Sequence, residues 1–271
     1  FAGANLDDEL YVRWLQYGVF QPIFRPHAQE EVASEPIHRS TEVMSLAKTA
    51  IELRYKLLPY NYNLSFQNHR DGTPLMRPLF FEDANPVLLT EAKTYFWGDD
   101  FLISPVLNLN KTKQVVYFPS NSKWFDFYTD QVIQGGQSES VQLSNAYIPT
   151  YVRAGAFIPM VQSLQTTDLY DAKILDLHYY HDPSVLNSER QFYNDDGTTS
   201  DAYEKGLFEL LKFESSVKKG KIVIIFKSNN GLNFISNSKQ INLIIHNLKT
   251  NPRRVSVNGT RIQNHKKTSN N

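Results

Sequence analysis

DELYVRWLQYGVFQPIFRPH, residues 8–27, is the stretch from which the rest of the chain is best understood. The acidic residues 7–9 favour a helix start, because the first turn of a helix carries partial positive charge. Leu10 and Trp14 then follow at roughly helical spacing. The apolar run 22–24 is typical of a short buried strand of a barrel. The stretch therefore predicts a helix followed by a strand.

A second, longer helix is predicted after this stretch. Ser40 or Thr41 can cap its N-terminus, because the side-chain oxygens of these residues accept from backbone amides of the first turn. Pro59 should end or kink this helix, since proline lacks the amide hydrogen and clashes with the preceding turn. The turn residues 68–72 close the helix-rich zone.

Strand patterns dominate from about residue 83. Runs rich in β-branched and aromatic residues are bounded by proline, glycine or asparagine. They cover 101–107, 114–119, 124–128, 150–153, 156–159, 174–180, 207–213, 221–227 and 240–246. We interpret them as two successive β-sandwiches. Because a helix–strand–helix piece buries little surface alone, the first zone is predicted to complete something larger.

Composition narrows the possible functions. The formal net charge is zero, and no basic patch or stripe indicates nucleic acid binding. No run of eighteen apolar residues is present, so we expect no membrane span. The absence of cysteine excludes disulfides, thiolate metal sites and a cysteine nucleophile. The 17 Phe, 15 Tyr and 3 Trp suit β-sheet cores and also sugar stacking, and for any single ring the core is the preferred interpretation.

Several stretches, in order, resemble glycoside hydrolase family 31. Residues 10–27 follow the family pattern Leu-x-x-Arg-Trp-x-Gln-x-Gly-x-Phe-x-Pro-x-x-Arg-x-His. Further matching stretches lie at 53–60, 72–79, 97–99, 102–106, 117–119, 152–159 and 193–197. The resemblance covers about residues 1–200, and its ordered matches make chance agreement a poor explanation.

The resemblance implies an α+β fragment of a larger enzyme. Residues 1–82 would be the last segments of a (β/α)8 barrel, followed by two antiparallel β-sandwich domains, 83–163 (proximal) and 164–271 (distal). The implied activity is that of a retaining α-glycosidase hydrolysing terminal α-linked glucose, or a related sugar such as xylose, from oligosaccharides. Both catalytic aspartates would lie upstream of this chain. The expected partners are the α-linked oligosaccharide and the missing N-terminal and barrel part of the same protein, with no cofactor or metal.

Four residues are candidates for the sugar site. His27 follows the predicted strand, near the end of the barrel where active sites lie, and the resemblance implies that it bonds sugar hydroxyls. Phe1 matches a phenylalanine that lines the same pocket. We expect Arg25 to pair with a neighbouring barrel carboxylate and hold the shape of the site. Glu35 is expected to brace the loop after His27, and Trp14 to lie in the core.

The acidic pairs of this chain do not suggest catalysis. Retaining glycosidases need two carboxyl groups about 5–5.5 Å apart. Asp99-Asp100 and Asp195-Asp196 are adjacent residues, whose side chains on a strand point to opposite faces. We expect them to be turn and surface residues. Asp195-Asp196-Gly197 has oxygens that suit calcium, but a tight turn is the preferred interpretation.

A function of another class stays open. The chain alone is also compatible with a non-catalytic carbohydrate-binding or structural β-sandwich module, which an exposed line of aromatic side chains on one sandwich face would support. Transglycosylation in place of hydrolysis would use the same residues. For the compartment, we favour the periplasm or the outside of the cell, by association with glycan degradation and because cysteine is absent.

Overall fold

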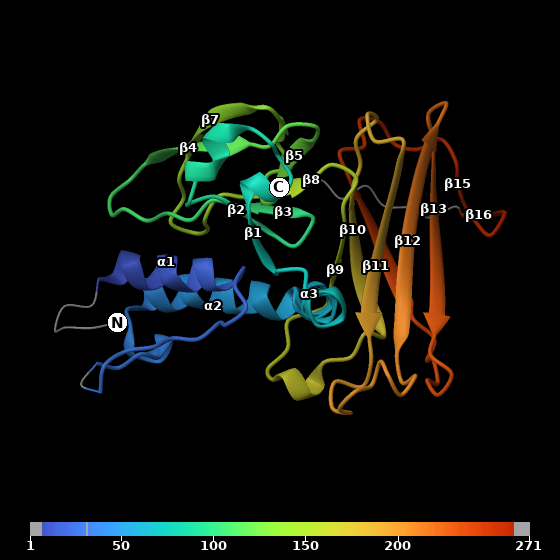
Figure 1. The fold of residues 1–271 in the computed structure, drawn as a ribbon, viewed down its shortest axis with the longest axis horizontal. Coiled ribbons are helices and arrows are strands. Elements are labelled where there is room, and N and C mark those ends of the chain that lie inside the picture. The colour runs from blue at the N-terminus through green and yellow to red at the C-terminus, as the bar shows by residue number, and fades with distance from the viewer. Residues whose placement is uncertain (1–6, 31, 263–271) are drawn as a thin grey trace.

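The computed structural model describes residues 7–30 and 32–262 of the 271-residue chain, and these are mostly β-strand with few helices (Figure 1). The helices are α1 (Asp8–Gly18), α2 (Thr41–Lys56) and α3 (Leu58–Asp71), with short 3-10 helices η1 (Pro36–His38), η2 (Leu79–Phe81), η3 (Pro86–Thr90) and η4 (Thr167–Leu169). The first strands are β1 (Met76–Pro78), β2 (Tyr95–Trp97), β3 (Phe101–Ile103), β4 (Lys113–Phe118), β5 (Lys123–Asp126), β6 (Val132–Gln134), β7 (Gln137–Gln142), β8 (Thr150–Arg153) and β9 (Phe157–Met160). The later strands are β10 (Ile174–Tyr180), β11 (Asn187–Asn194), β12 (Glu209–Lys218), β13 (Lys221–Asn230), β14 (Gln240–His246), β15 (Val255–Val257) and β16 (Thr260–Ile262).

Helices α1 and α2 begin at predicted signals, and α2 ends before the predicted break. The Asp7 side chain accepts from the first turn of α1, and the Ser40 side chain accepts from that of α2. The predicted break at Pro59 is confirmed, because α2 stops at Lys56 and Pro59 lies in the first turn of a new helix. This helix, α3, was not predicted, and it continues to Asp71, so most of the turn predicted at 68–72 is helical; Gly72 follows as its C-cap, with a φ of 75° that suits glycine.

The predicted barrel strand at residues 22–24 was wrong for the chain as the structure has it. The segment is irregular, and the Ile23 side chain is 74% exposed. A strand requires a hydrogen-bonding neighbour, and no described strand pairs with this segment. Pro22 also removes one backbone donor from it.

The first large sheet has the strand order β1-β2-β3-β8-β5-β6, and all its pairs are antiparallel. One face packs against the two-stranded sheet β4-β7 through a buried cluster. This cluster contains Phe96, Leu102 and Trp124 from the large sheet and Val116 and Phe118 from β4. These two sheets thus form two packed layers, and their assignment to a separate sandwich domain stays a prediction.

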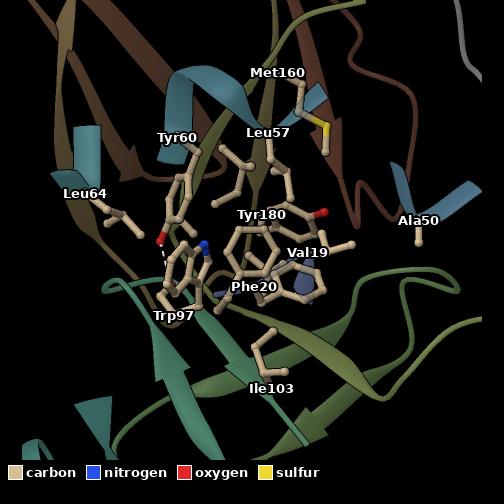
Figure 2. Close-up of a cluster of buried hydrophobic side chains, with 14 of the residues drawn as sticks. Val19, Phe20, Ala50, Leu57, Tyr60, Leu64, Trp97, Ile103, Met160 and Tyr180 are labelled. Carbon is tan, nitrogen blue, oxygen red and sulfur yellow. Dashed lines mark hydrogen bonds between the residues drawn. The ribbon is translucent and has the colours of Figure 1, made fainter. Parts of the chain in front are cut away.

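The opposite face of the same sheet packs against the helices. Figure 2 shows Trp97 and Ile103 from the sheet meeting Phe20, Leu57 and Tyr60 from the helical part. The Tyr60 hydroxyl donates to the Trp97 carbonyl at 3.0 Å. Because both faces of the sheet are covered, β2 and β3 are apolar at every position and do not alternate.

A second pair of sheets follows, with orders β14-β10-β9 and β11-β12-β13. Their inner side chains, among them Leu177, Tyr179, Phe192 and Phe213, share one core. The expectation of purely antiparallel sheets meets one exception, because β10 and β14 pair in parallel. Parallel neighbours need a long crossover connection, and here that connection contains β11, β12 and β13.

Strand pairing crosses both predicted domain boundaries. β1 precedes residue 82 but pairs with β2, and β9 precedes residue 163 but pairs with β10. The division into 1–82, 83–163 and 164–271 stays a prediction.

Candidate functional site

His27 lies on an irregular segment, residues 19–27, which we call the His27 segment. Its first carbonyl groups accept hydrogen bonds from one side chain of α2. The Arg54 guanidinium donates to the carbonyls of Val19 at 2.8 Å, Gln21 at 2.6 Å and Pro22 at 3.3 Å. These three carbonyls of a segment that is not in a strand are therefore satisfied by a side chain.

The ring of Phe24 anchors the middle of the His27 segment. It packs so closely on the end of α1 that a Cβ atom added to Gly18 would lie 2.6 Å from the ring. The guanidinium carbon of Arg54 is 6.0 Å from the ring centroid. Glycine at position 18 thus leaves room for this close approach.

The last residues of the segment form a polar pair. Arg25 Nη2 lies 2.6 Å from His27 Nδ1, and Trp14 Nε1 donates to the Arg25 carbonyl at 3.3 Å. A guanidinium has only donors, so Nδ1 of His27 is the acceptor and the proton of the neutral ring is on Nε2. The structure thus brings Arg25 and His27 together on the surface, where both are exposed.

One expectation about these side chains is wrong, and another stays a prediction. Among residues 7–30 and 32–262, no carboxylate lies within ion-pair distance of Arg25, whose guanidinium contacts His27, so its pairing with a barrel carboxylate stays a prediction. Trp14 was expected in the core but is 46% exposed. The buried stripe of α1 is formed by Tyr11 and Leu15, and Trp14 lies beside that stripe rather than within it.

Glu35 lies at the start of η1, where its carbonyl accepts from the His38 amide at 3.2 Å. Burial raises the pKa of the Tyr11 hydroxyl; the Arg39 guanidinium opposes this rise and Glu35 adds to it. The loop is also held by the Tyr11 hydroxyl, which donates to the Ser34 carbonyl at 2.7 Å. Phe1, the fourth candidate, lies outside the described residues.

The acidic pair in the β2–β3 turn has structural partners. Asp100 is only 2% exposed, so its prediction as a surface residue was wrong. Arg190 of β11 binds it through Nε at 2.8 Å and 3.0 Å, which joins the first large sheet to the second pair of sheets. The Asp100 carboxylate raises the pKa of Arg190. Asp99 lies close to Arg77 of β1 in an ion pair.

The second acidic pair is engaged in its own turn. Asp195 accepts from the hydroxyls of Tyr62 and Tyr193, both at 2.7 Å. Asp196 accepts from Thr199, whose hydroxyl and amide lower the pKa of the carboxyl to about 2. The contacts of Asp196 are those of a tight turn, whereas the Tyr62 hydroxyl connects Asp195 to α3. In the described part of the chain, no group of three or more His, Cys, Asp or Glu side chains is arranged to hold a metal ion.

Two hollows lie away from His27. A cavity of about 150 Å³ is lined by residues of α3, β11 and the β2–β3 turn, and a groove of about 420 Å³ runs beside the start of β4. His27 lines neither of them. The His27 side chain is exposed.

Arg54 is the residue that sequence reasoning missed. In the sequence it is only one member of a helical periodicity, whereas its side chain reaches the His27 segment. A charged residue within the apolar repeat of a helix was the available signal, since such a position favours a long side chain that extends to distant acceptors.

None of the helices in residues 7–30 and 32–262 combines the length and the apolar character needed to cross a membrane.

Comparison with known proteins agrees with this arrangement. The profile of the glycosyl hydrolases family 31 TIM-barrel domain matches residues 1–64, and that of the family 31 C-terminal domain matches residues 72–158. An alpha-xylosidase from Saccharolobus solfataricus is 34% identical over 220 residues, which are 80% of this chain and 29% of the relative. Alpha-glucosidase 2 from Bacillus thermoamyloliquefaciens is 32% identical over 83% of this chain and 28% of its own length.

A solved structure shows the same fold. The family 31 dextranase of Flavobacterium johnsoniae, complexed with glucose, superposes with a TM-score of 0.87 at 30% identity, over 96% of this chain and 32% of the dextranase. All these similar proteins are carbohydrate-processing enzymes. This chain belongs to glycoside hydrolase family 31 and corresponds to the family's C-terminal portion. It spans less than a third of the length of the curated relatives named above.

Proposed function

We propose that this chain is part of a retaining α-glycosidase, which hydrolyses terminal α-linked glucose or a related sugar such as xylose from oligosaccharides. The observation that carries the proposal is the exposed Arg25–His27 pair, which lies within the region matched by the family's barrel domain. The names of the relatives, an alpha-xylosidase and an alpha-glucosidase, support the substrate class.

In this proposal, the bond-breaking chemistry comes from two aspartates upstream of the chain. A retaining mechanism needs one carboxylate to attack the anomeric carbon and a second carboxyl group to protonate the leaving oxygen. The two pairs of adjacent aspartates, Asp99-Asp100 and Asp195-Asp196, are engaged in turns and ion pairs. They lie at structural positions, which supports a catalytic pair elsewhere in the protein.

His27 then contributes by hydrogen bonding. With Nδ1 turned to Arg25, the protonated Nε2 is a donor suited to a sugar hydroxyl. A donor whose bond fits the distorted sugar of the transition state better than the sugar of the ground state lowers the barrier rather than only tightening binding. In this arrangement Arg25 orients the imidazole, Glu35 supports the following loop, and Phe1 lines the pocket.

The barrel part of the proposal rests on the match of residues 1–64 to the family's barrel domain. A (β/α)8 barrel has eight strands, whereas residues 7–30 and 32–75 contain none. We propose that residues 1–82 are the last barrel segments and that the barrel strands belong to the preceding part of the same protein. Residues 83–163 and 164–271 are then the proximal and distal domains. The sheet β1-β2-β3-β8-β5-β6, which packs against the helices, connects them to the barrel.

The alternative of a carbohydrate-binding module draws little support from the surface. The exposed aromatic side chains of the described residues are Trp14, Phe80, Phe81 and Phe226. Phe226 alone lies on a strand, β13, so the described strands present no line of exposed rings. We therefore favour the enzyme.

The test is a His27→Ala substitution in the full-length protein, assayed on aryl α-glucosides and α-xylosides. Loss of one transition-state hydrogen bond should lower kcat/KM by about 10- to 1000-fold. Because His27 is exposed, the thermal midpoint should stay unchanged. Wild-type turnover by the folded variant would refute the role of His27.

A further inference from the structure

We propose that Arg54 of α2 is a positioning residue for the sugar site, and that it holds the His27 segment in the geometry that aims the imidazole. This inference rests on the proposed glycosidase function. It adds a residue outside the predicted site, since Arg54 is 27 positions from His27 in the chain and on a different element.

The contacts of Arg54 are directed at the segment. Its two terminal nitrogens donate to the carbonyls of Val19, Gln21 and Pro22, at 2.8, 2.6 and 3.3 Å. The planar guanidinium presents several donors in a fixed fork, so it can hold three carbonyls that a single ammonium group cannot span. The Phe20 carbonyl, between them, accepts from the Tyr95 hydroxyl at 2.9 Å.

The charge of Arg54 has no acidic partner among the described residues. Burial lowers the pKa of its guanidinium to about 10, so the group stays charged at neutral pH. A largely buried cation that is compensated by backbone carbonyls is costly to keep. α2 does not depend on it, because Ser40 caps that helix and Ala47 packs it into the core.

A series of contacts along the segment connects Arg54 to His27. The Phe24 ring is packed on Gly18, with the Arg54 guanidinium on its face. The next residue, Arg25, is held through its carbonyl and contacts His27 Nδ1 through its side chain. Loosening the carbonyls of residues 19–22 should therefore let the whole segment move.

The first experiment replaces Arg54 by lysine in the full-length protein. Lysine keeps the charge and the stem but not the fork, so kcat/KM should fall by about 10- to 100-fold, mainly through kcat, as expected for a misplaced catalytic-site group. Arg70→Lys is the matched control, because Arg70 lies on α3 and contacts Asp71 and the Phe66 ring. Equal activity of Arg54→Lys and Arg70→Lys would overturn the inference.

A double-mutant cycle separates positioning from general weakening. If Arg54 acts through His27, adding Arg54→Lys to His27→Ala should change kcat/KM by less than about 3-fold, because coupled residues are non-additive. A full multiplicative loss would mean that Arg54 acts elsewhere, and the inference would fail. Full activity of His27→Ala would instead refute the role proposed for His27, on which this inference rests.

Hydrogen exchange provides a readout that does not depend on activity. Arg54→Lys should speed exchange of the amides between Phe20 and His27, while the amides of β2 and β3 keep wild-type rates. Unchanged exchange rates across the His27 segment would refute the proposal that Arg54 holds this segment, whatever the activity of the enzyme.

Discussion

Two short apolar runs of this chain, Pro22-Ile23-Phe24 and Phe101-Leu102-Ile103, adopt different backbone structures. The second is strand β3, paired with β2 and β8 and fully buried on both faces. The first is irregular, and Ile23 is 74% exposed. Similar local sequence therefore does not decide whether a strand forms, because a strand also needs neighbours that accept and donate its hydrogen bonds. β3 has such neighbours within the described residues and the His27 segment does not.

Replacing one side chain in each run by alanine should show the largest contrast in the free energy of unfolding. Phe101→Ala removes a fully buried ring that contacts Phe20, Tyr60 and Phe127, and should lower the free energy of unfolding by about 3–5 kcal/mol. Ile23→Ala is the matched control and should change it by less than about 0.5 kcal/mol. Denaturant unfolding of both variants measures the difference. Equal effects would show that Ile23 is buried in the folded protein.

The ion pair between Asp100 and Arg190 gives the next contrast. Asp100→Ala leaves a largely buried guanidinium without its carboxylate, and should destabilise the protein by about 3 kcal/mol. Arg25→Ala removes an exposed guanidinium and should cost less than about 1 kcal/mol. Denaturation midpoints that are equal for the two variants would contradict the structural role of Asp100.

The second pair of sheets should make stability depend on pH. Burial, and then the neighbouring His246, lower the pKa of His178 to about 4, well below its ordinary value of 6.5. The unfolded chain therefore binds the proton more readily, so stability is full above pH 6.5 and falls as the pH drops toward 4. We expect a loss on the order of 2 kcal/mol over this window, measured by denaturant unfolding at each pH. His178→Asn should flatten the curve between pH 6.5 and 4.5, and a curve of unchanged slope would contradict the assignment.

The smallest expected effect lies under the His27 segment. Gly18→Ala places a methyl group 2.6 Å from the Phe24 ring, which must move. This substitution should lower the free energy of unfolding by about 1–2 kcal/mol. That value lies toward the lower end for overpacking, because the Phe24 ring is only half-buried and can shift outward. Thermal unfolding measures it, with Ser45→Ala on the exposed face of α2 as control. A neutral Gly18→Ala variant would show that Phe24 does not rest on α1.

Sequence patterns predicted the sheets better than the site. The strands at 150–153, 174–180 and 240–246 are confirmed at their predicted bounds, because each is a run of residues with high strand preference between turn residues. Helix α3 was missed, since its asparagines and aromatics are poor helix formers, and contacts such as Trp97 with Asn61 stabilise it instead.

In the site, the closeness of Arg25 and His27 follows from their separation by two residues. The bonds from Arg54 to Val19 and Gln21 span more than 30 positions. No local pattern indicates such a contact, because it depends on how α1 and α2 pack. Long-range contacts of this kind are the part of the candidate site that only the structure provides.

The most direct test compares two forms of the protein, the 271-residue chain alone and the protein with its upstream segment, for hydrolysis of an aryl α-glucoside and an aryl α-xyloside. Our account predicts turnover by the longer form with retention of anomeric configuration, and none by the 271-residue chain at equal concentration. Turnover by the 271-residue chain alone would contradict it, because the catalytic carboxyl groups would then lie within residues 1–271.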